Sequence, residues 1–188
     1  SAVTNMSYMF NGALVFNKDI SSWDTSAVIN MTCMFTGAIL FNQDISTSNT
    51  SNVTNMQGMF SGASSFNNGG QPFITKVNGW NTIKVANMSN MFYDAVLFNQ
   101  DISSWNTSVV ANMTSMFGNA TAFNNGGQPF ITTINGWNTS AVTNMSSMFY
   151  KAILFNTDIS SWNTLKVTNM SCMFQYATAF NNGGQPLT

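Results

Sequence analysis

The sequence predicts an α/β repeat solenoid in which each unit of 25 or 32 residues contains one short parallel strand and one short helix. Three observations support this fold class. One pattern recurs along the whole chain, the methionines and phenylalanines fall in fixed columns of that pattern, and the apolar spacing changes between the two parts of each copy. Neither part can bury its apolar side alone, so neighbouring copies must stack.

The repeat follows the pattern V-x-N-M-x-x-M-F-x-x-A-x-x-F-N. All 14 methionines occupy two columns of it, and 14 of the 16 phenylalanines occupy two more. Residues 1–188 form a single array whose seven copies begin at Val3, Val28, Val53, Val85, Val110, Val142 and Val167. The chain starts and stops inside a unit. Both ends are therefore expected to be uncapped, as in a piece of a longer array or in a protomer that stacks on further copies.

Long copies differ from short ones by a seven-residue insertion. The insertion begins with Asn-Asn-Gly-Gly-Gln-Pro, a composition typical of turns. An aliphatic pair such as Leu14-Val15 precedes each short connection, whereas small or polar residues precede the long ones. The complete insertions bring their own pairs, Phe73-Ile74 and Phe130-Ile131. We expect these pairs to fill the space that the aliphatic pair fills in short copies.

Within one copy, two segments have different patterns. From Val28 to Ala38 the apolar residues recur at helical spacing, which predicts a helix of about three turns. Thr25 is a plausible N-cap and Gly37 lies near the expected end. The segment Asp-Ile-Ser-Ser-Trp is short and tolerant of β structure, which predicts a strand. Strands of successive copies would pair in parallel about 4.8 Å apart.

A longer string, F-N-x-D-I-S-S-W-D/N-T-S-x-V-x-N-M-S-x-M-F-x-x-A, is seen most fully at residues 155–177. It resembles the roughly 26-residue repeat of BspA-like bacterial surface proteins, also known as a repeat of unknown function in mycoplasma lipoproteins. The resemblance covers essentially the whole chain, but the short period here is 25 residues and the insertions are not part of the motif. It implies a leucine-rich-repeat-like solenoid on a secreted or surface-anchored protein, with relatives implicated in adhesion and no catalytic activity.

Composition narrows the possible functions. The chain has five Lys, six Asp and no His, Arg or Glu, and its net charge is −1. It offers no basic patch for nucleic acid or for an anionic membrane surface. No apolar run approaches the roughly 18 residues of a membrane-spanning helix. Any export signal is expected outside this segment. Because the common general bases reduce to Asp and Lys, we expect no enzyme, no catalytic residue and no cofactor.

No metal site is predicted. An aspartate recurs in every short connection, and only Asp19 and Asp44 lie on consecutive copies. These two are the candidates for calcium ligands, because carboxylates on adjacent rungs can converge. The alternative is a local turn in which each carboxylate accepts a hydrogen bond from a nearby backbone N–H.

One asparagine column recurs without exception in the pattern. Six of its seven members are followed by Met-Ser or Met-Thr and so match glycosylation sequons. Because they lie between core Val and Met positions, we expect a ladder of amides inside the stack that satisfies backbone groups at each turn. The ladder residues are Asn5, Asn30, Asn55, Asn87, Asn112, Asn144 and Asn169.

A tryptophan column is the best candidate for a binding face, with Ser48 as its one exception. Strand alternation would expose the indoles as an adhesive or carbohydrate-binding ladder, whereas a bend after the strand would turn them into the core. The column contains Trp23, Trp80, Trp105, Trp137 and Trp162.

Two further columns carry alternatives. The threonine column that contains Thr25 and Thr50 could form an exposed lattice for ice or a set of N-caps. Cys33 and Cys172 share a column five rungs apart, too far for an intramolecular disulfide. They are expected to be small buried side chains, or else cross-links between chains.

These observations favour a non-enzymatic structural or adhesive protein in the extracellular space or at the cell surface. Its partners would be further copies of itself, stacked end to end or side by side, or other surface proteins and glycans. The alternative is a ligand-binding solenoid that presents a regular Asn/Ser/Thr/Trp face to calcium, glycan or ice.

Overall fold

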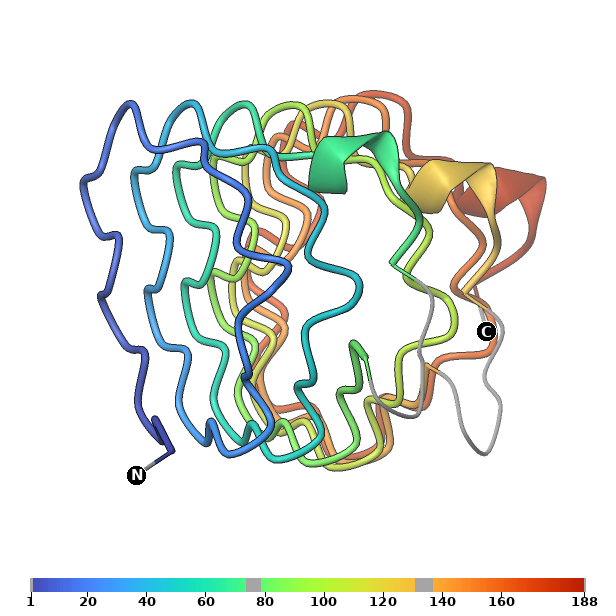
Figure 1. Cartoon of the computed structure of the whole chain (residues 1–188). Helices are drawn as coiled ribbons and strands as arrows, with labels where there is room; N and C mark the ends of the chain where they lie inside the picture. Colours follow the sequence, from blue (N-terminus) through green and yellow to red (C-terminus); the bar gives the residue numbers. More distant parts are fainter. Residues whose placement is uncertain (1, 74–78, 131–136, 188) are drawn as a thin grey trace.

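The computed structural model of the chain describes residues 2–73, 79–130 and 137–187. The backbone winds into a row of coils stacked in sequence order (Figure 1). We call each coil a rung, so that rung 1 begins at Val3 and rung 7 at Val167. Parallel bridges between equivalent asparagines join each rung to the next, from Asn5↔Asn30 through to Asn144↔Asn169. The prediction of stacked tandem repeats is confirmed.

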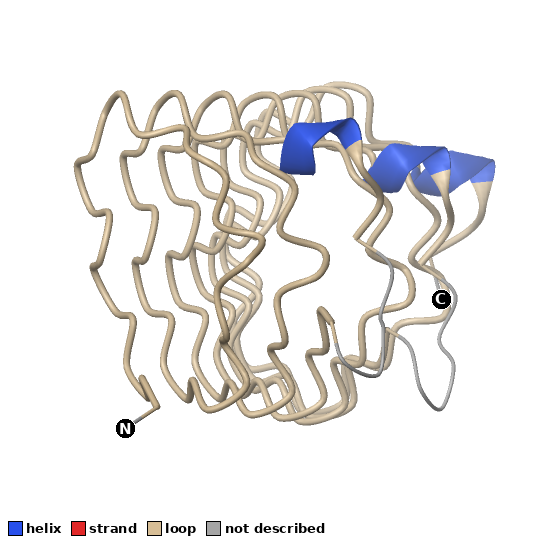
Figure 2. Cartoon of the chain, viewed as in Figure 1, coloured by secondary structure: helices blue, strands red, loops and turns tan. Residues whose placement is uncertain are grey.

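Regular secondary structure is almost absent from the described residues (Figure 2). Three short 3-10 helices occur, η1 (Asn68–Gly70), η2 (Asn125–Gly127) and η3 (Asn182–Gly184). Each lies in the Asn-Asn-Gly-Gly-Gln-Pro segment of a long rung. In this part of the chain no helix is long and apolar enough to cross a membrane.

The helix predicted from Val28 to Ala38 does not form. Alternate N–H groups point along the rod axis instead: Cys33 N–H donates to Gln57 O at 2.8 Å and Phe35 N–H to Met59 O at 2.8 Å. In an α-helix these donors would bond four residues back along their own chain. The positive φ angles of Cys33 (53°) and Gly37 (68°) also break helical geometry.

Successive tight turns produce the spacing that resembled a helix. Met34 N–H donates to Met31 O at 3.3 Å, and Ala38 N–H donates to Phe35 O at 3.0 Å. Each such turn brings a side chain back to the interior after three residues. A row of turns and a helix therefore share nearly the same apolar period, although only the row of turns leaves alternate backbone donors free to join rungs.

The strand predicted for Asp-Ile-Ser-Ser-Trp is also absent. In rung 1 these residues make a turn in which Trp23 N–H donates to Ile20 O at 3.0 Å. Parallel pairing occurs instead at the asparagine column that includes Asn30 and Asn55, inside the segment assigned to the helix. The α/β description of the unit is therefore corrected to a solenoid of turns and short extended stretches.

The core consists of side-chain ladders that run along the rod. Two phenylalanine columns stack within each rung, as Phe35 on Phe41 with ring centroids 3.9 Å apart. They also stack between rungs, as Phe35 on Phe60 at 5.7 Å. The methionine, valine and alanine columns of the inner rungs are buried beside them. Such offset aromatic contacts add to the stabilisation that burial of apolar area supplies.

The inserted phenylalanines join this core. Phe73 is fully buried, with its ring centroid 4.6 Å from that of Trp80, and Phe130 takes the equivalent place beside Trp137 at 4.4 Å. The aliphatic pairs of the short rungs do not share that space, because Leu14 is 54% exposed and Val15 is 80% exposed. The prediction that the two kinds of pair fill one space is therefore wrong. Ile74 and Ile131 lie outside the described residues.

Candidate functional site

The tryptophan column lies in the core. Trp80, Trp105 and Trp137 are fully buried, and Trp23 and Trp162 are half-buried against the same core cluster. Neighbouring indoles stay in register, with centroids 5.9 Å apart for Trp80 and Trp105. In the short rungs a turn that ends at the tryptophan supplies the inward bend, as where Trp105 N–H donates to Ile102 O at 3.0 Å. These five residues therefore form no continuous exposed aromatic face.

The indole N–H groups differ between rungs. Trp105 Nε1 donates to Phe73 O at 3.1 Å, a carbonyl that the insertion of the preceding long rung provides. The Nε1 atoms of Trp80, Trp137 and Trp162 are buried without a hydrogen-bond partner in the described structure. A long rung does precede Trp162, but its equivalent carbonyl, Phe130 O, accepts from the Ser161 hydroxyl at 3.1 Å.

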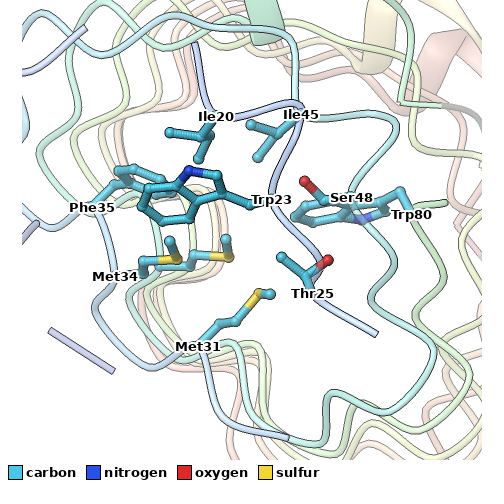
Figure 3. A pocket seen from close by; sticks show the side chains of 10 residues that line it. Ile20, Trp23, Thr25, Met31, Met34, Phe35, Ile45, Ser48 and Trp80 are labelled. Atoms are coloured by element: carbon cyan, nitrogen blue, oxygen red, sulfur yellow. The ribbon is translucent and has the colours of Figure 1, made fainter. Parts of the chain in front are cut away.

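The column has a single break, at Ser48 in rung 2. Neighbouring side chains nearly fill the place of the missing indole, and the cavity that remains between rungs 1, 2 and 3 is about 10 Å³, room for about one water molecule. Figure 3 shows the indoles of Trp23 and Trp80 on opposite sides of this space, with Ile20 and Ile45 along one edge. The Ser48 side chain lies between the two indoles.

The Asn5 column does not form the predicted internal ladder of amides. Its side chains are half-buried or exposed, and each Oδ1 accepts a bond within its own rung. Asn30 Oδ1, for example, accepts from the Thr32 N–H at 3.0 Å and the Thr32 hydroxyl at 2.7 Å. The contact between rungs at this column comes from the backbone bridges. The column therefore fixes turns and backbone register.

A second asparagine column, which sequence reasoning missed, carries the side-chain ladder between rungs. Asn17 Oδ1 accepts from Asn42 N–H at 2.9 Å, and Asn42 Oδ1 accepts from Asn67 N–H at 2.8 Å. The bond recurs at each step up to Asn156, which accepts from Asn181 N–H at 2.7 Å. The signal was present in the sequence, because this asparagine follows the second phenylalanine in all seven copies.

The threonine column also connects rungs. Thr50 is fully buried, and its hydroxyl donates to Asn81 O at 2.7 Å. Thr107 is buried in the same way and donates to Asn138 O at 2.8 Å. These side chains are therefore neither helix N-caps nor an exposed lattice for ice.

Asp19 and Asp44 each close a local turn. Asp19 Oδ1 accepts from Ser21 N–H at 2.8 Å, and Asp44 Oδ1 accepts from Ser46 N–H at 2.8 Å. The bond from the Ser21 backbone, followed by that from the Ser21 hydroxyl, lowers the pKa of Asp19 below its ordinary value. Among the described residues, no three His, Cys, Asp or Glu side chains gather closely enough to hold a metal ion.

The two cysteines occupy a column of turn residues at the surface. Cys33 is half-buried, Cys172 is exposed, and both are free thiols. Their φ angles are positive, at 53° and 56°. The prediction that both are small buried side chains is wrong, because this column turns the backbone outward and does not fill the core.

A family model described as "Mycoplasma protein of unknown function, DUF285" matches the chain three times, at residues 1–75, 68–130 and 125–186. The second and third matches start 57 residues apart, the length of one short and one long rung together. No curated protein and no solved structure matches the chain.

Proposed function

We propose that this chain, which belongs to the Mycoplasma protein family of unknown function DUF285, is a non-enzymatic structural module of an extracellular surface protein. In this role it is a rod that lengthens by stacking rung on rung, either within a longer chain or between copies. Its exposed sides and ends contact other surface molecules.

The observation that carries this proposal is the uniformity of the contacts along the rod. Each rung meets its neighbours through the same backbone bridges, asparagine ladder, threonine bonds and stacked phenylalanines. Contacts that repeat in one direction are heterologous, so the surface used on one side of a rung differs from the surface used on the other. Such contacts extend an array without closing it.

The remaining chemistry supports a structural role. The chain has no His and no Glu, and the carboxylates of Asp19 and Asp44 already accept hydrogen bonds in local turns. The likeness of the repeat to that of BspA-like surface proteins supports a location outside the cell and an adhesive role. Low charge suits contacts made by packing and hydrogen bonds, which salt weakens little.

Assembly can be tested with two aspartate substitutions at similarly exposed apolar residues. Met9 is 52% exposed on rung 1 in a column that is buried in the inner rungs, and Leu14 is 54% exposed at the side of the rod. We expect light scattering and electron microscopy to show end-to-end assembly of the unmodified chain and of Leu14→Asp. Met9→Asp should remain monomeric, because a desolvated charge opposes stacking. A monomeric unmodified chain at all concentrations rejects self-assembly.

Location can be tested on intact cells. A protease added outside the cells should remove the region recognised by an antibody against this repeat, while a cytosolic control protein remains whole. Digestion only after lysis would reject the surface assignment.

A further inference from the structure

A stripe of exposed aliphatic side chains runs along one edge of the rod. It is formed by the two residues that precede the second phenylalanine of each short rung. Backbone hydrogen bonds keep this column in line from rung to rung: Leu40 N–H donates to Leu14 O at 3.1 Å, and Ser65 N–H donates to Ile39 O at 3.1 Å. The exposed members are Leu14 (54%), Val15 (80%), Ile39 (42%), Leu40 (48%), Leu97 (56%), Ile153 (36%) and Leu154 (56%). A row of large apolar side chains at the surface marks an interaction site.

The long rungs interrupt the stripe with small side chains. The same two columns hold Ser64-Ser65 in rung 3, Thr121-Ala122 in rung 5 and Thr178-Ala179 in rung 7. The column three residues after the second phenylalanine alternates as well, because every short rung has an aspartate there and every long rung has a glycine. From rung 2 to rung 7, large and charged positions therefore alternate with small and neutral ones.

We propose that two copies of the chain pair side by side and antiparallel through this stripe. The pairing specifies one of the side contacts of the proposed function and does not depend on end-to-end stacking. A twofold axis that crosses both rods brings each column opposite itself. With rung 4 opposite rung 5, rung 3 lies opposite rung 6 and rung 2 opposite rung 7, so that a short rung always faces a long one. Leu154, for example, then lies opposite Ser65 of the second copy.

Shape and charge both favour this register. Large side chains pack against small ones, which gives the close fit typical of specific interfaces. Each aspartate comes opposite a glycine, as Asp101 does with Gly126 and Asp158 with Gly69 of the second copy. In an antiparallel pair with short rungs opposite short rungs, the aliphatic pairs would collide and the aspartates would repel each other. A parallel pair in register would also place aliphatic pairs against each other and leave gaps between the small ones.

The narrow stripe makes the pairing weak in a chain of seven rungs. We expect the pair to bury less than the roughly 1,200 Å² typical of a stable interface, and therefore to have a dissociation constant of about 0.1–1 mM. Met9→Asp should be monomeric below this range and should form only side-by-side pairs within it, because its end is blocked. This variant is therefore the background in which pairing is measured, and it separates the stripe from end-to-end assembly.

Sedimentation equilibrium in the Met9→Asp background tests the register. Ser65→Leu sets leucine against Leu154 of the second copy, and Leu154→Ser leaves a gap at the same contact, so each substitution alone should weaken dimerisation about 10-fold or more. The two substitutions together restore a large side chain opposite a small one and should return dimerisation to that of the background. Ile83→Ser is the control, because Ile83 is 47% exposed outside the stripe. It should leave the dissociation constant unchanged.

Disulfide cross-linking tests the same register independently of affinity. With the two native cysteines replaced by serine, Ser65→Cys combined with Leu154→Cys should form a covalent dimer on oxidation. Within one chain these sites are three rungs apart, roughly 14 Å, which is too far for a disulfide. Val15→Cys combined with Leu154→Cys is the control, because rung 1 faces no rung of the second copy in this register.

Three results would overturn the proposal. They are a Met9→Asp protein that stays monomeric up to about 3 mM, a combined variant that dimerises no better than the single substitutions, and a control cysteine pair that cross-links as readily as the pair at Ser65 and Leu154.

Discussion

Asparagine side chains perform two different tasks in each rung. In the Asn5 column the amide oxygen closes a turn two residues ahead, as Asn30 does with Thr32. In the Asn17 column the amide oxygen reaches the next rung and accepts from its backbone. An uncharged acceptor suits the second task, because identical side chains repeat every rung and a column of carboxylates would repel itself.

Asn42 offers a direct test of the ladder. Its Oδ1 accepts from Asn67 N–H at 2.8 Å and from Gly69 N–H at 2.9 Å. We expect Asn42→Ala to lower the free energy of unfolding by about 1–3 kcal/mol, since it leaves these donors without their acceptor. Asn11 is exposed and makes no side-chain hydrogen bond in the described structure, so Asn11→Ala is the control. Urea denaturation measures both, and equal losses would contradict the ladder.

The hydrogen bonds to the aspartates of rung 1 predict that the folded state becomes slightly less stable in acid. The Ser26 hydroxyl and then the Ser26 backbone lower the pKa of Asp24 below its ordinary value of 3.8, and Ser21 lowers the pKa of Asp19. A carboxyl whose folded pKa is depressed stabilises the fold above its unfolded pKa. That contribution disappears as the pH falls through the folded pKa.

A single substitution tests the contribution of the Ser26 hydroxyl to the lowered pKa of Asp24. Ser26→Ala should raise the pKa of Asp24 towards its ordinary value and leave that of Asp19 unchanged, as carboxyl ¹³C NMR titration would show. An unchanged pKa of Asp24 would mean that the Ser26 hydroxyl is not its main partner.

At the scale of elements, the turn of the long rungs depends on three consecutive residues with positive φ. In η2 these are Asn125 (50°), Gly126 (58°) and Gly127 (79°). Asn125 Oδ1 accepts from Ile102 N–H of the preceding short rung at 2.9 Å. A Cβ on Gly126 would lie 3.0 Å from Asp101 N, whereas a Cβ on Gly127 would meet nothing within 4 Å.

Alanine substitutions at Gly126 and Gly127 distinguish the cost of backbone strain from the cost of a steric clash with the preceding rung. Gly127→Ala should cost about 1–2 kcal/mol of unfolding free energy, because an L-residue in the left-handed region is strained. Gly126→Ala adds a steric conflict with the preceding rung and should cost about 1–3 kcal/mol more. Urea denaturation of both variants measures the difference. Equal costs would show that η2 does not pack tightly on the short rung.

The sequence was sufficient to predict the number of rungs, their two lengths and the apolar columns of methionine, phenylalanine and valine, because these follow directly from the repeat. It did not predict which other columns are buried: the Asn5 column, the cysteines and the aliphatic pairs lie nearer the surface than expected. It failed at the element level. Val28, Met31 and Met34 recur every three residues both in a helix and in a row of turns, so spacing alone could not distinguish them. One signal in the sequence could have separated them. Tyr8, Cys33 and Gly58 share one column and have positive φ, and side chains so different in size indicate a position fixed by backbone conformation and not by packing. At Ser48 the sequence shows that the indole is missing, but the way in which neighbouring side chains fill its place depends on the three-dimensional stack.

For the whole molecule, the order of short and long rungs follows from these contacts. Each of the three long rungs follows a short one. The turns of long rungs pack on backbone that short rungs supply: Asn68 Oδ1 accepts from Ile45 N–H at 3.0 Å, and Asn182 Oδ1 accepts from Ile159 N–H at 2.9 Å. The unfolding free energy of such an array is close to the sum of the intrinsic stabilities of the rungs and of the interactions between adjacent rungs. The interaction of a long rung with its neighbour should therefore depend on whether the preceding rung is short or long.

Two deletions of 25 residues test this dependence at constant length. Removal of residues 28–52 places long rung 3 on short rung 1 and keeps the order, so the protein should unfold cooperatively with little loss beyond that of one rung. Removal of residues 85–109 places long rung 5 directly on long rung 3. Asn125 then loses its donor from Ile102, and two insertions meet without a short rung between them.

We expect the second deletion to be less stable than the first by about 2–4 kcal/mol, from the unsatisfied groups and the poorer packing. Urea denaturation monitored by tryptophan fluorescence measures both variants. If the two deletion variants have the same stability, the interaction free energy between adjacent rungs does not depend on rung length. A long rung would then pack equally well on a short or a long neighbour. The alternation of short and long rungs would have to be explained by the surface that the insertions expose.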